Sequence, residues 1–268
     1  MKYLIEKEIS RGGFATVYRG LDVAQRPAAI KTYHVDRDVR QVLTNSVRTH
    51  KLLNQDSPRF PKLYCHDERS LVMEFIDGVN LSSLGHHQAE DVVLVIAYQL
   101  AVCLYEFHGS RLENSPIHRD VKPGNIIVRR DGILVLCDFD LSMIDEFSID
   151  GSERMIGTPQ FYSPEQIKGT QVLPISDLFS VGSTLYKILT GECLFRSSVD
   201  PYVDIEDLVN SALKLLSGYM GEVIGSCWRE GRSYENAEHM ADELANRLRR
   251  IGIDPEKSHE VLAGLVNR

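Results

Sequence analysis

The sequence is poor in the features that mark exported, nucleic-acid-binding and membrane-spanning proteins. Its five cysteines among 268 residues form no C-x-x-C pair, which argues against a zinc site or a disulfide framework. The formal net charge of -8 argues against binding nucleic acid through bulk electrostatics. The N-terminus lacks the apolar core of a signal peptide, and the most apolar stretch, 92–105, is shorter than the roughly 20 residues that span a bilayer. We therefore expect a cytoplasmic protein that binds neither nucleic acid nor a membrane.

The pattern of hydrophobic residues changes near residue 78. Before it, strand-like segments at 2–9, 15–22, 27–33, 63–64 and 71–75 are separated by turn residues, and one helix is predicted over 36–55. After it, helices are predicted over 89–108, 176–190, 204–217, 219–230 and 236–250, with short strands at 126–129 and 134–137. Ser176 is a candidate N-cap. Residues 138–170 read as irregular, and 253–268 as an amphipathic tail. A strand-rich lobe followed by a larger helical lobe is the expected α+β fold.

Four short polar motifs follow one another in the second half of the chain. They are His118-Arg119-Asp120-Val121-Lys122-Pro123-Gly124-Asn125, Asp138-Phe139-Asp140, Gly157-Thr158-Pro159 and Ser163-Pro164-Glu165. Their order and spacing resemble those of the H-R-D, D-F-G and A-P-E elements of Hanks-type Ser/Thr protein kinases. The resemblance covers about residues 5 to 250. It implies one domain over 1–268, with an N-lobe at 1–73, a hinge at 74–78 and a C-lobe at 79–268.

The resemblance implies transfer of the γ-phosphate of ATP to Ser or Thr of a protein substrate, with Mg²⁺ as the metal. This reaction needs positioning and charge neutralisation more than covalent chemistry. Asp120 would orient the acceptor hydroxyl, and Lys122 would neutralise the migrating phosphoryl group. Lys31, in Ala29-Ile30-Lys31, would contact the α- and β-phosphates. Asn125 and Asp138 supply the oxygen ligands that Mg²⁺ prefers.

The resemblance also places the nucleotide site. Only the middle glycine of the family's glycine-rich loop is kept, at Gly12, because Ser10 and Ala15 stand at the other two positions. Met73 falls at the gatekeeper position, and the backbone of Glu74 and Ile76 would bind the adenine edge. Asn80 falls where a ribose-binding polar residue often stands. The full predicted set is Ile9, Ser10, Arg11, Gly12, Gly13, Phe14, Ala15, Val17, Ala29, Lys31, Met73, Glu74, Ile76, Asn80 and Ile127.

Further residues match structural and regulatory positions of the family. Asp177 would hold the backbone of the catalytic loop, and Glu165 would pair with Arg232. Thr158 is expected to hydrogen-bond Asp120 and Lys122, as in Ser/Thr-directed kinases. Arg119 could bind a phosphate on the activation segment. The candidate acceptors there are Ser148 and Ser152, for which a plain exposed serine is the alternative.

The chain departs from the family pattern at two places. No glutamate occurs between Lys31 and Asp67, although active kinases usually pair this lysine with a glutamate on the N-lobe helix. Thr49, or Arg48 with a one-residue slip, falls at that position. Lys31 would then be held by Asp138, by the nucleotide, or by an aspartate after a helix movement. Asp140 replaces the glycine of D-F-G, where it would either limit flipping of residues 138–140 or add a carboxylate near the metal.

These departures keep two other functions open. A pseudokinase that binds nucleotide as a scaffold fits the missing glutamate and the thin glycine loop. A small-molecule kinase of the aminoglycoside or choline type shares the two aspartates but lacks the segment that docks a peptide, which this chain has at 157–159 and 163–165. The chain ends soon after the kinase elements, so we expect no attached sensor domain or membrane anchor.

Overall fold

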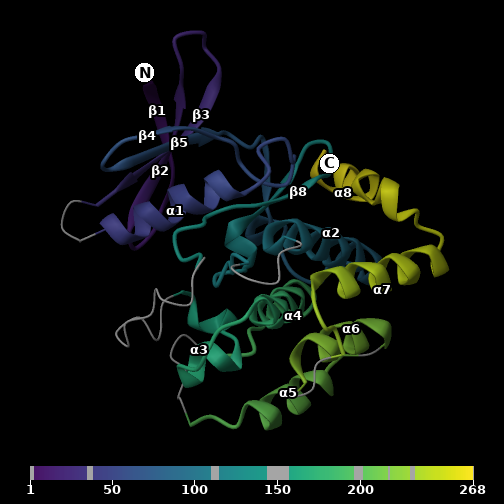
Figure 1. Ribbon diagram of the computed structural model, residues 1–268. Coiled ribbons are helices and arrows are strands. Elements are labelled where there is room, and N and C mark those ends of the chain that lie inside the picture. The colour runs from purple at the N-terminus through teal and green to yellow at the C-terminus, as the bar shows by residue number, and fades with distance from the viewer. Residues whose placement is uncertain are drawn as a thin grey trace.

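The computed structural model describes residues 3–34, 39–109, 115–143, 157–195, 202–216, 218–229 and 233–267. Figure 1 shows an N-terminal sheet with one helix beneath it, stacked on a larger group of helices. The chain passes from the first part to the second after strand β5 (Ser70–Glu74). This arrangement is the α+β architecture that the sequence pattern predicts.

The N-terminal sheet is antiparallel and has the strand order β1-β2-β3-β5-β4. Its strands are β1 (Leu4–Arg11), β2 (Ala15–Leu21), β3 (Pro27–Tyr33), β4 (Leu63–His66) and β5 (Ser70–Glu74). Helix α1 (Arg40–Leu52) packs on this sheet through Leu43 and Val47, which join Tyr33 and Leu71 in one apolar cluster. The register pairs Lys31 of β3 with Leu71 of β5, which places Lys31 in the centre of the sheet.

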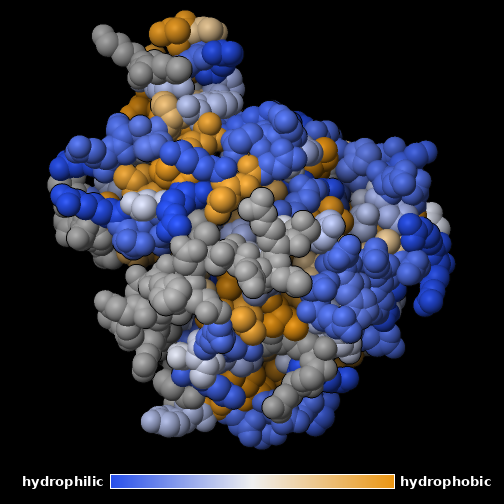
Figure 2. Space-filling view, viewed as in Figure 1, coloured by the Kyte–Doolittle hydropathy of each residue, from blue (hydrophilic) through white to orange (hydrophobic). Residues whose placement is uncertain are grey.

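The C-terminal part surrounds helix α2 (Glu90–His108), whose apolar stretch is 67% buried. By length and composition alone α2 could cross a membrane, but its burial is that of a core helix. Figure 2 shows a mostly hydrophilic surface over α7 and α8. The helices are α2 (Glu90–His108), α3 (Pro164–Lys168), α4 (Pro174–Thr190), α5 (Ile205–Leu213), α6 (Gly218–Trp228), α7 (Ala237–Arg250) and α8 (Ser258–Val266).

A small second sheet connects the two parts. Strands β6 (Gly78–Asn80), β7 (Ile126–Arg129) and β8 (Leu134–Leu136) pair in that order. Asn80 pairs with Ile127, so the segment that follows the hinge lies beside the strand that follows the catalytic loop. The sheet therefore places residues 120–125 and 138–140 at the junction of the two parts.

Two local expectations are wrong. Ser176 is not the N-cap of α4, because the helix begins two residues earlier at Pro174, and proline is well suited to the first helical position. The Ser176 hydroxyl instead accepts a hydrogen bond from the backbone N–H of Leu173. Residues 138–170 are not irregular throughout, because Ser163 caps the short helix α3 by a reciprocal bond pair with Gln166.

Candidate active site

The carboxylate of Asp120 lies at the centre of a buried hydrogen-bond network. Its Oδ2 accepts from Lys122 Nζ at 2.6 Å and from Asn125 Nδ2 at 2.9 Å. Its Oδ1 accepts from the hydroxyl of Thr158 at 2.9 Å and from the Thr158 backbone N–H at 3.1 Å. Lys122 Nζ also donates to the Thr158 hydroxyl at 2.6 Å. The expected contacts of Thr158 with Asp120 and Lys122 are thus confirmed, and they join the catalytic loop to the 157–159 segment.

Asp177 supports the catalytic loop from α4. Its two carboxylate oxygens accept from the backbone N–H groups of His118, at 2.8 Å, and Arg119, at 2.9 Å, as the sequence predicts. The ring of His108 lies 2.9 Å from the same carboxylate. Burial raises the pKa of Asp177, but these bonds outweigh it and hold the pKa below its usual range. Arg119 has a φ of 67°, which is unfavourable for arginine, and the bond that its N–H donates to Asp177 helps to maintain this conformation.

Lys31 is paired with two carboxylates, neither of them on α1. Its Nζ lies 2.6 Å from Asp138 Oδ1 and 2.7 Å from Asp140 Oδ2. The lysine is buried, and although burial lowers its pKa, the two carboxylates more than compensate and raise it. On α1, Thr49 is buried and Arg48 is exposed, which favours Thr49 over Arg48 at the position of the family's helix glutamate. Of the possible partners, Asp138 is confirmed for this structure, and Asp140 is an addition that sequence reasoning missed.

The pKa values of the two aspartates shift in opposite directions, although Lys31 lowers both. Burial raises the pKa of Asp140, whose side chain is only 6% exposed. Asp138 is 40% exposed at its side chain, and Lys31 outweighs its partial loss of solvation and lowers its pKa. Asp138 also has a φ of 69°, whereas Asp140 is not among the residues with positive φ. The backbone at Asp140 therefore has no need of the glycine that the family carries there.

Asn125 and Asp138 fit the metal site that the sequence predicts. The Cys137 backbone N–H donates to the Asn125 carbonyl at 2.8 Å, which places the two residues on neighbouring segments. Asn125 donates its amide nitrogen to Asp120, and Asp138 uses Oδ1 for Lys31, so an oxygen of each remains for a hard cation. Among the described residues no cluster of three His, Cys, Asp or Glu side chains occurs. Further ligands would come from a bound nucleotide or water.

The predicted glycine-rich segment forms the tight turn between β1 and β2. Gly12 N–H donates to the Ala15 carbonyl at 2.8 Å, so the turn itself is only three residues long. Ala15 is buried, and Phe14 packs against the apolar cluster under the sheet. Ala29 pairs with Met73 across β3 and β5. The other residues that the sequence predicts to contact the nucleotide here lie along the same hairpin, namely Ile9, Ser10, Arg11, Gly13 and Val17.

The hinge side chains have structural partners of their own. Glu74 accepts from Arg129 Nη1 at 3.4 Å, and Ile76 is buried. Asn80 caps the turn at 81–83 through Ser82 N–H and donates to the Gly124 carbonyl at 2.8 Å. Asn80 thus ties the segment after the hinge to the catalytic loop, and its contact with a ribose stays a prediction.

Phe139 is fully buried in a cluster of rings that spans the two parts of the molecule. Its ring centroid lies 4.7 Å from His50 of α1, 5.5 Å from Phe107 of α2 and 5.8 Å from His118. Phe60 packs against it at 6.2 Å. These contacts hold Phe139 in the core, so Asp138 on one side and Asp140 on the other have defined positions.

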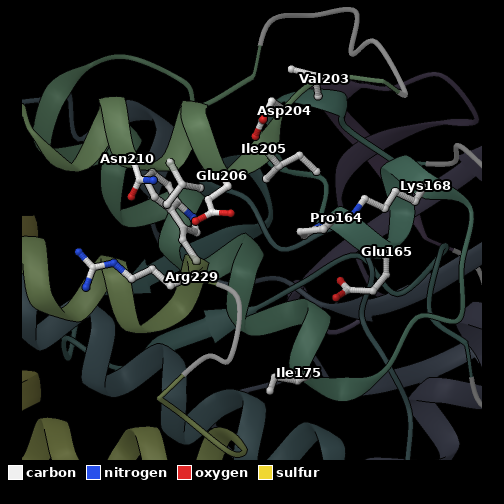
Figure 3. Close-up of a pocket in the computed structure, with 12 residues that line it drawn as sticks. Pro164, Glu165, Lys168, Ile175, Val203, Asp204, Ile205, Glu206, Asn210 and Arg229 are labelled. Atoms are coloured by element: carbon white, nitrogen blue, oxygen red, sulfur yellow. The ribbon is translucent and has the colours of Figure 1, made fainter.

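Three predicted residues lie outside the described residues, namely Arg232, Ser148 and Ser152. The pairing of Glu165 with Arg232 therefore stays a prediction, while Glu165 accepts from the Ser176 hydroxyl at 3.1 Å. Glu165 also lines a cavity of about 880 Å³ bounded by α3, α5 and the end of α6. Figure 3 shows its lining side chains, among which Glu165 is the sole member of the predicted site. A smaller cavity of about 200 Å³ is lined by Lys122, Pro123 and Gly124 of the catalytic loop.

Lys31 is held by Asp138, and Asp120 is held by Lys122 and Thr158. These two sets of contacts are those of a phosphotransferase site of the protein-kinase type. The model of the protein kinase domain matches residues 3–248, and the chain belongs to this family. It is 28% identical to the serine/threonine-protein kinase PknA of Corynebacterium glutamicum over 274 residues, and this region is 94% of this chain and 57% of PknA.

Two other relatives have comparable similarity. Serine/threonine-protein kinase PknL of Mycobacterium tuberculosis is 35% identical over 206 residues, which are 72% of this chain and 50% of that protein. Serine/threonine-protein kinase ppk11 of Schizosaccharomyces pombe is 30% identical over 192 residues, which are 69% of this chain and 60% of that protein. The chain thus spans about half the length of the curated relatives it matches.

Proposed function

We propose that this protein is an ATP-dependent serine/threonine protein kinase that uses Mg²⁺. The observation that carries the proposal is the network of Asp120, Lys122 and Thr158. Thr158 belongs to the segment that docks a peptide in protein kinases, and its hydroxyl bridges the side chains of Asp120 and Lys122. This bond favours a protein substrate over a small molecule, because it couples that segment to the residue that orients the acceptor.

The chemistry follows from the charges and hydrogen bonds at the site. Asp120 would accept the hydrogen bond of the substrate hydroxyl and direct its oxygen to the γ-phosphorus. Lys122, 2.6 Å from Asp120, would balance the charge of the moving phosphoryl group. Lys31 would hold the α- and β-phosphates. Mg²⁺, held by Asn125 and Asp138, would neutralise charge between the phosphates.

The pairing of Lys31 removes one of the two features that favoured the pseudokinase alternative, the missing helix glutamate. A lysine without any acid partner would be costly to bury and would lack a defined position. Here Lys31 has two carboxylates within 2.7 Å, so the loss of the helix glutamate leaves it oriented.

We also propose that the protein resides in the cytoplasm, where thiols are kept reduced, because all five cysteines are free. Cell fractionation that recovers it with membranes or exported proteins would contradict this location.

The test of activity is incubation with labelled ATP, Mg²⁺ and a generic protein acceptor. Wild-type protein is expected to place label on serine or threonine, in itself or in the acceptor. Asp120→Asn should reduce the rate by at least about 100-fold, because the amide is a poor acceptor for the hydroxyl proton. Asp131→Asn, which changes a partly exposed aspartate in the turn after β7, is the matched control and should keep the wild-type rate. Equal labelling by wild type and Asp120→Asn, or none by wild type, would refute the proposal.

A further inference from the structure

Asp140 gives Lys31 a carboxylate partner of the kind that a glutamate on the N-lobe helix usually provides in active kinases. Helix α1 contains no acidic residue, and its buried polar side chains are those of Ser46, Thr49 and His50. The carboxylate of Asp140 instead reaches Lys31 from the segment that follows β8, at 2.7 Å. Its side chain is 6% exposed, so the pair is shielded from solvent and interacts more strongly than a surface pair.

The second oxygen of Asp140 is also held. Asp140 Oδ1 accepts from the hydroxyl of Tyr33 at 2.7 Å, and Tyr33 is 2% exposed. Tyr33 stands on β3 two residues after Lys31, so both side chains project from the same face of that strand. The carboxylate is therefore clamped between a lysine and a tyrosine of one strand, which fixes its orientation.

The presence of two carboxylates matters once a metal binds. Asp138 is the metal ligand of the proposed site, and a cation bound there would compete with Lys31 for its oxygens. Asp140 would not have to bind the metal as well, because one of its oxygens bonds to Lys31 and the other to Tyr33. Lys31 would thus keep a carboxylate partner while its remaining donors face the phosphates, since an ammonium group has three.

We propose that Asp140 is the positioning residue for Lys31, so that the phosphate-binding lysine is oriented by the 138–140 segment together with β3 and not by α1. This inference rests on the proposed kinase function for its consequence in catalysis. The claim that Asp140 orients Lys31 towards the nucleotide does not depend on catalysis, and nucleotide binding alone tests it. The lysine and the metal ligand then form one preassembled unit, and a displacement of α1 does not by itself remove the partner of Lys31.

The test is a double-mutant cycle on nucleotide binding, with Lys31→Met, Asp140→Asn and the double variant. Titration with fluorescently labelled ADP and Mg²⁺ measures the dissociation constant of each protein. We expect each single change to raise this constant about tenfold, and the double variant to bind no more than about twofold more weakly than Lys31→Met. Asp242→Asn, which removes an exposed aspartate of α7, is the control for the loss of one charge and should bind like wild type. A double variant whose loss is the product of the single losses would overturn the proposal.

Two further measurements separate positioning from a general structural effect. Tyr33→Phe keeps the ring and removes the hydroxyl that orients Asp140, so it should weaken nucleotide binding about threefold in the wild type and not at all in Asp140→Asn. The same weakening in both backgrounds would contradict a role through Asp140. Steady-state kinetics of Asp140→Asn should show a raised KM for ATP with the KM for the protein substrate unchanged. A wild type that binds ADP through this coupled pair but transfers no phosphate would refute the proposed function and leave the positioning intact.

Discussion

The buried histidine of α1 makes the stability of this protein depend on pH. His50 is 2% exposed, and its ring lies 4.7 Å from Phe139. Burial, and next the positive charge of Lys31, lower the pKa of His50 from 6.5 to about 4. Between these two values the unfolded chain binds a proton that the folded protein does not. The contribution of His50 to stability is therefore complete above about pH 6.5 and is lost as the pH drops towards 4.

The size of this loss follows from the shift. One pKa unit corresponds to about 1.4 kcal/mol, so a shift of about 2.5 units amounts to about 3 kcal/mol in full and about 2 kcal/mol by pH 5. Replacing His50 with leucine or glutamine removes the titrating group. Both variants should therefore lose about 2 kcal/mol less than wild type between pH 7 and pH 5, whatever their absolute stability.

The assay is urea unfolding of the three proteins at both pH values. Leucine adds apolar contact with Phe139 and glutamine keeps a polar side chain, so agreement between the two isolates the titration from the packing. The other histidines are present in all three proteins and cancel in the comparison. Equal losses for wild type and both variants between pH 7 and pH 5 would refute the reasoning.

Two further changes test contacts away from His50. Thr158→Val removes the hydroxyl between Asp120 and Lys122 and should lower kcat about tenfold with the KM for ATP unchanged. Thr158→Ser keeps the hydroxyl and should keep most of the activity. Steady-state kinetics measure both variants, and a wild-type kcat for Thr158→Val would contradict the role of this hydroxyl. Gly132→Ala should lower the free energy of unfolding by at least about 2 kcal/mol, because its φ is 83° and a Cβ would lie 1.7 Å from the His259 carbonyl oxygen. An unchanged melting temperature for Gly132→Ala would show that α8 is not packed against this turn.

Contacts within the short motifs could be predicted from the sequence. Asp120, Lys122 and Asn125 lie within six residues, so their mutual bonds are set by the local loop. Those to Thr158 and Asp177 were predictable only because the motifs match a family whose loop geometry is known. The α+β arrangement followed from the change in hydrophobic pattern near residue 78, which separates strands from helices.

The partner of Lys31 could not be predicted in the same way. Lys31 and Asp140 are separated by more than a hundred residues, and their contact depends on how the sheet is placed over the 138–140 turn. No period or spacing in the sequence reports that placement. The absence of a helix glutamate was visible, but the carboxylate that replaces it had two other plausible roles until its distance to Lys31 was known. The start of α4 was missed for a local reason, because Pro174 begins the helix before the serine that resembles a cap.

The ring cluster around Phe139 has a consequence for inhibitors. Some kinase inhibitors bind only after the phenylalanine of the D-F-G motif has left its pocket. In this protein such a compound must first separate Phe139 from the rings of His50, Phe60, Phe107 and His118. At roughly 0.5–1.5 kcal/mol for each pair, that separation costs about 2–6 kcal/mol before any gain from the drug. Compounds that occupy the proposed nucleotide site with Phe139 in place avoid this penalty. We expect them to dominate any set of inhibitors selected against this protein.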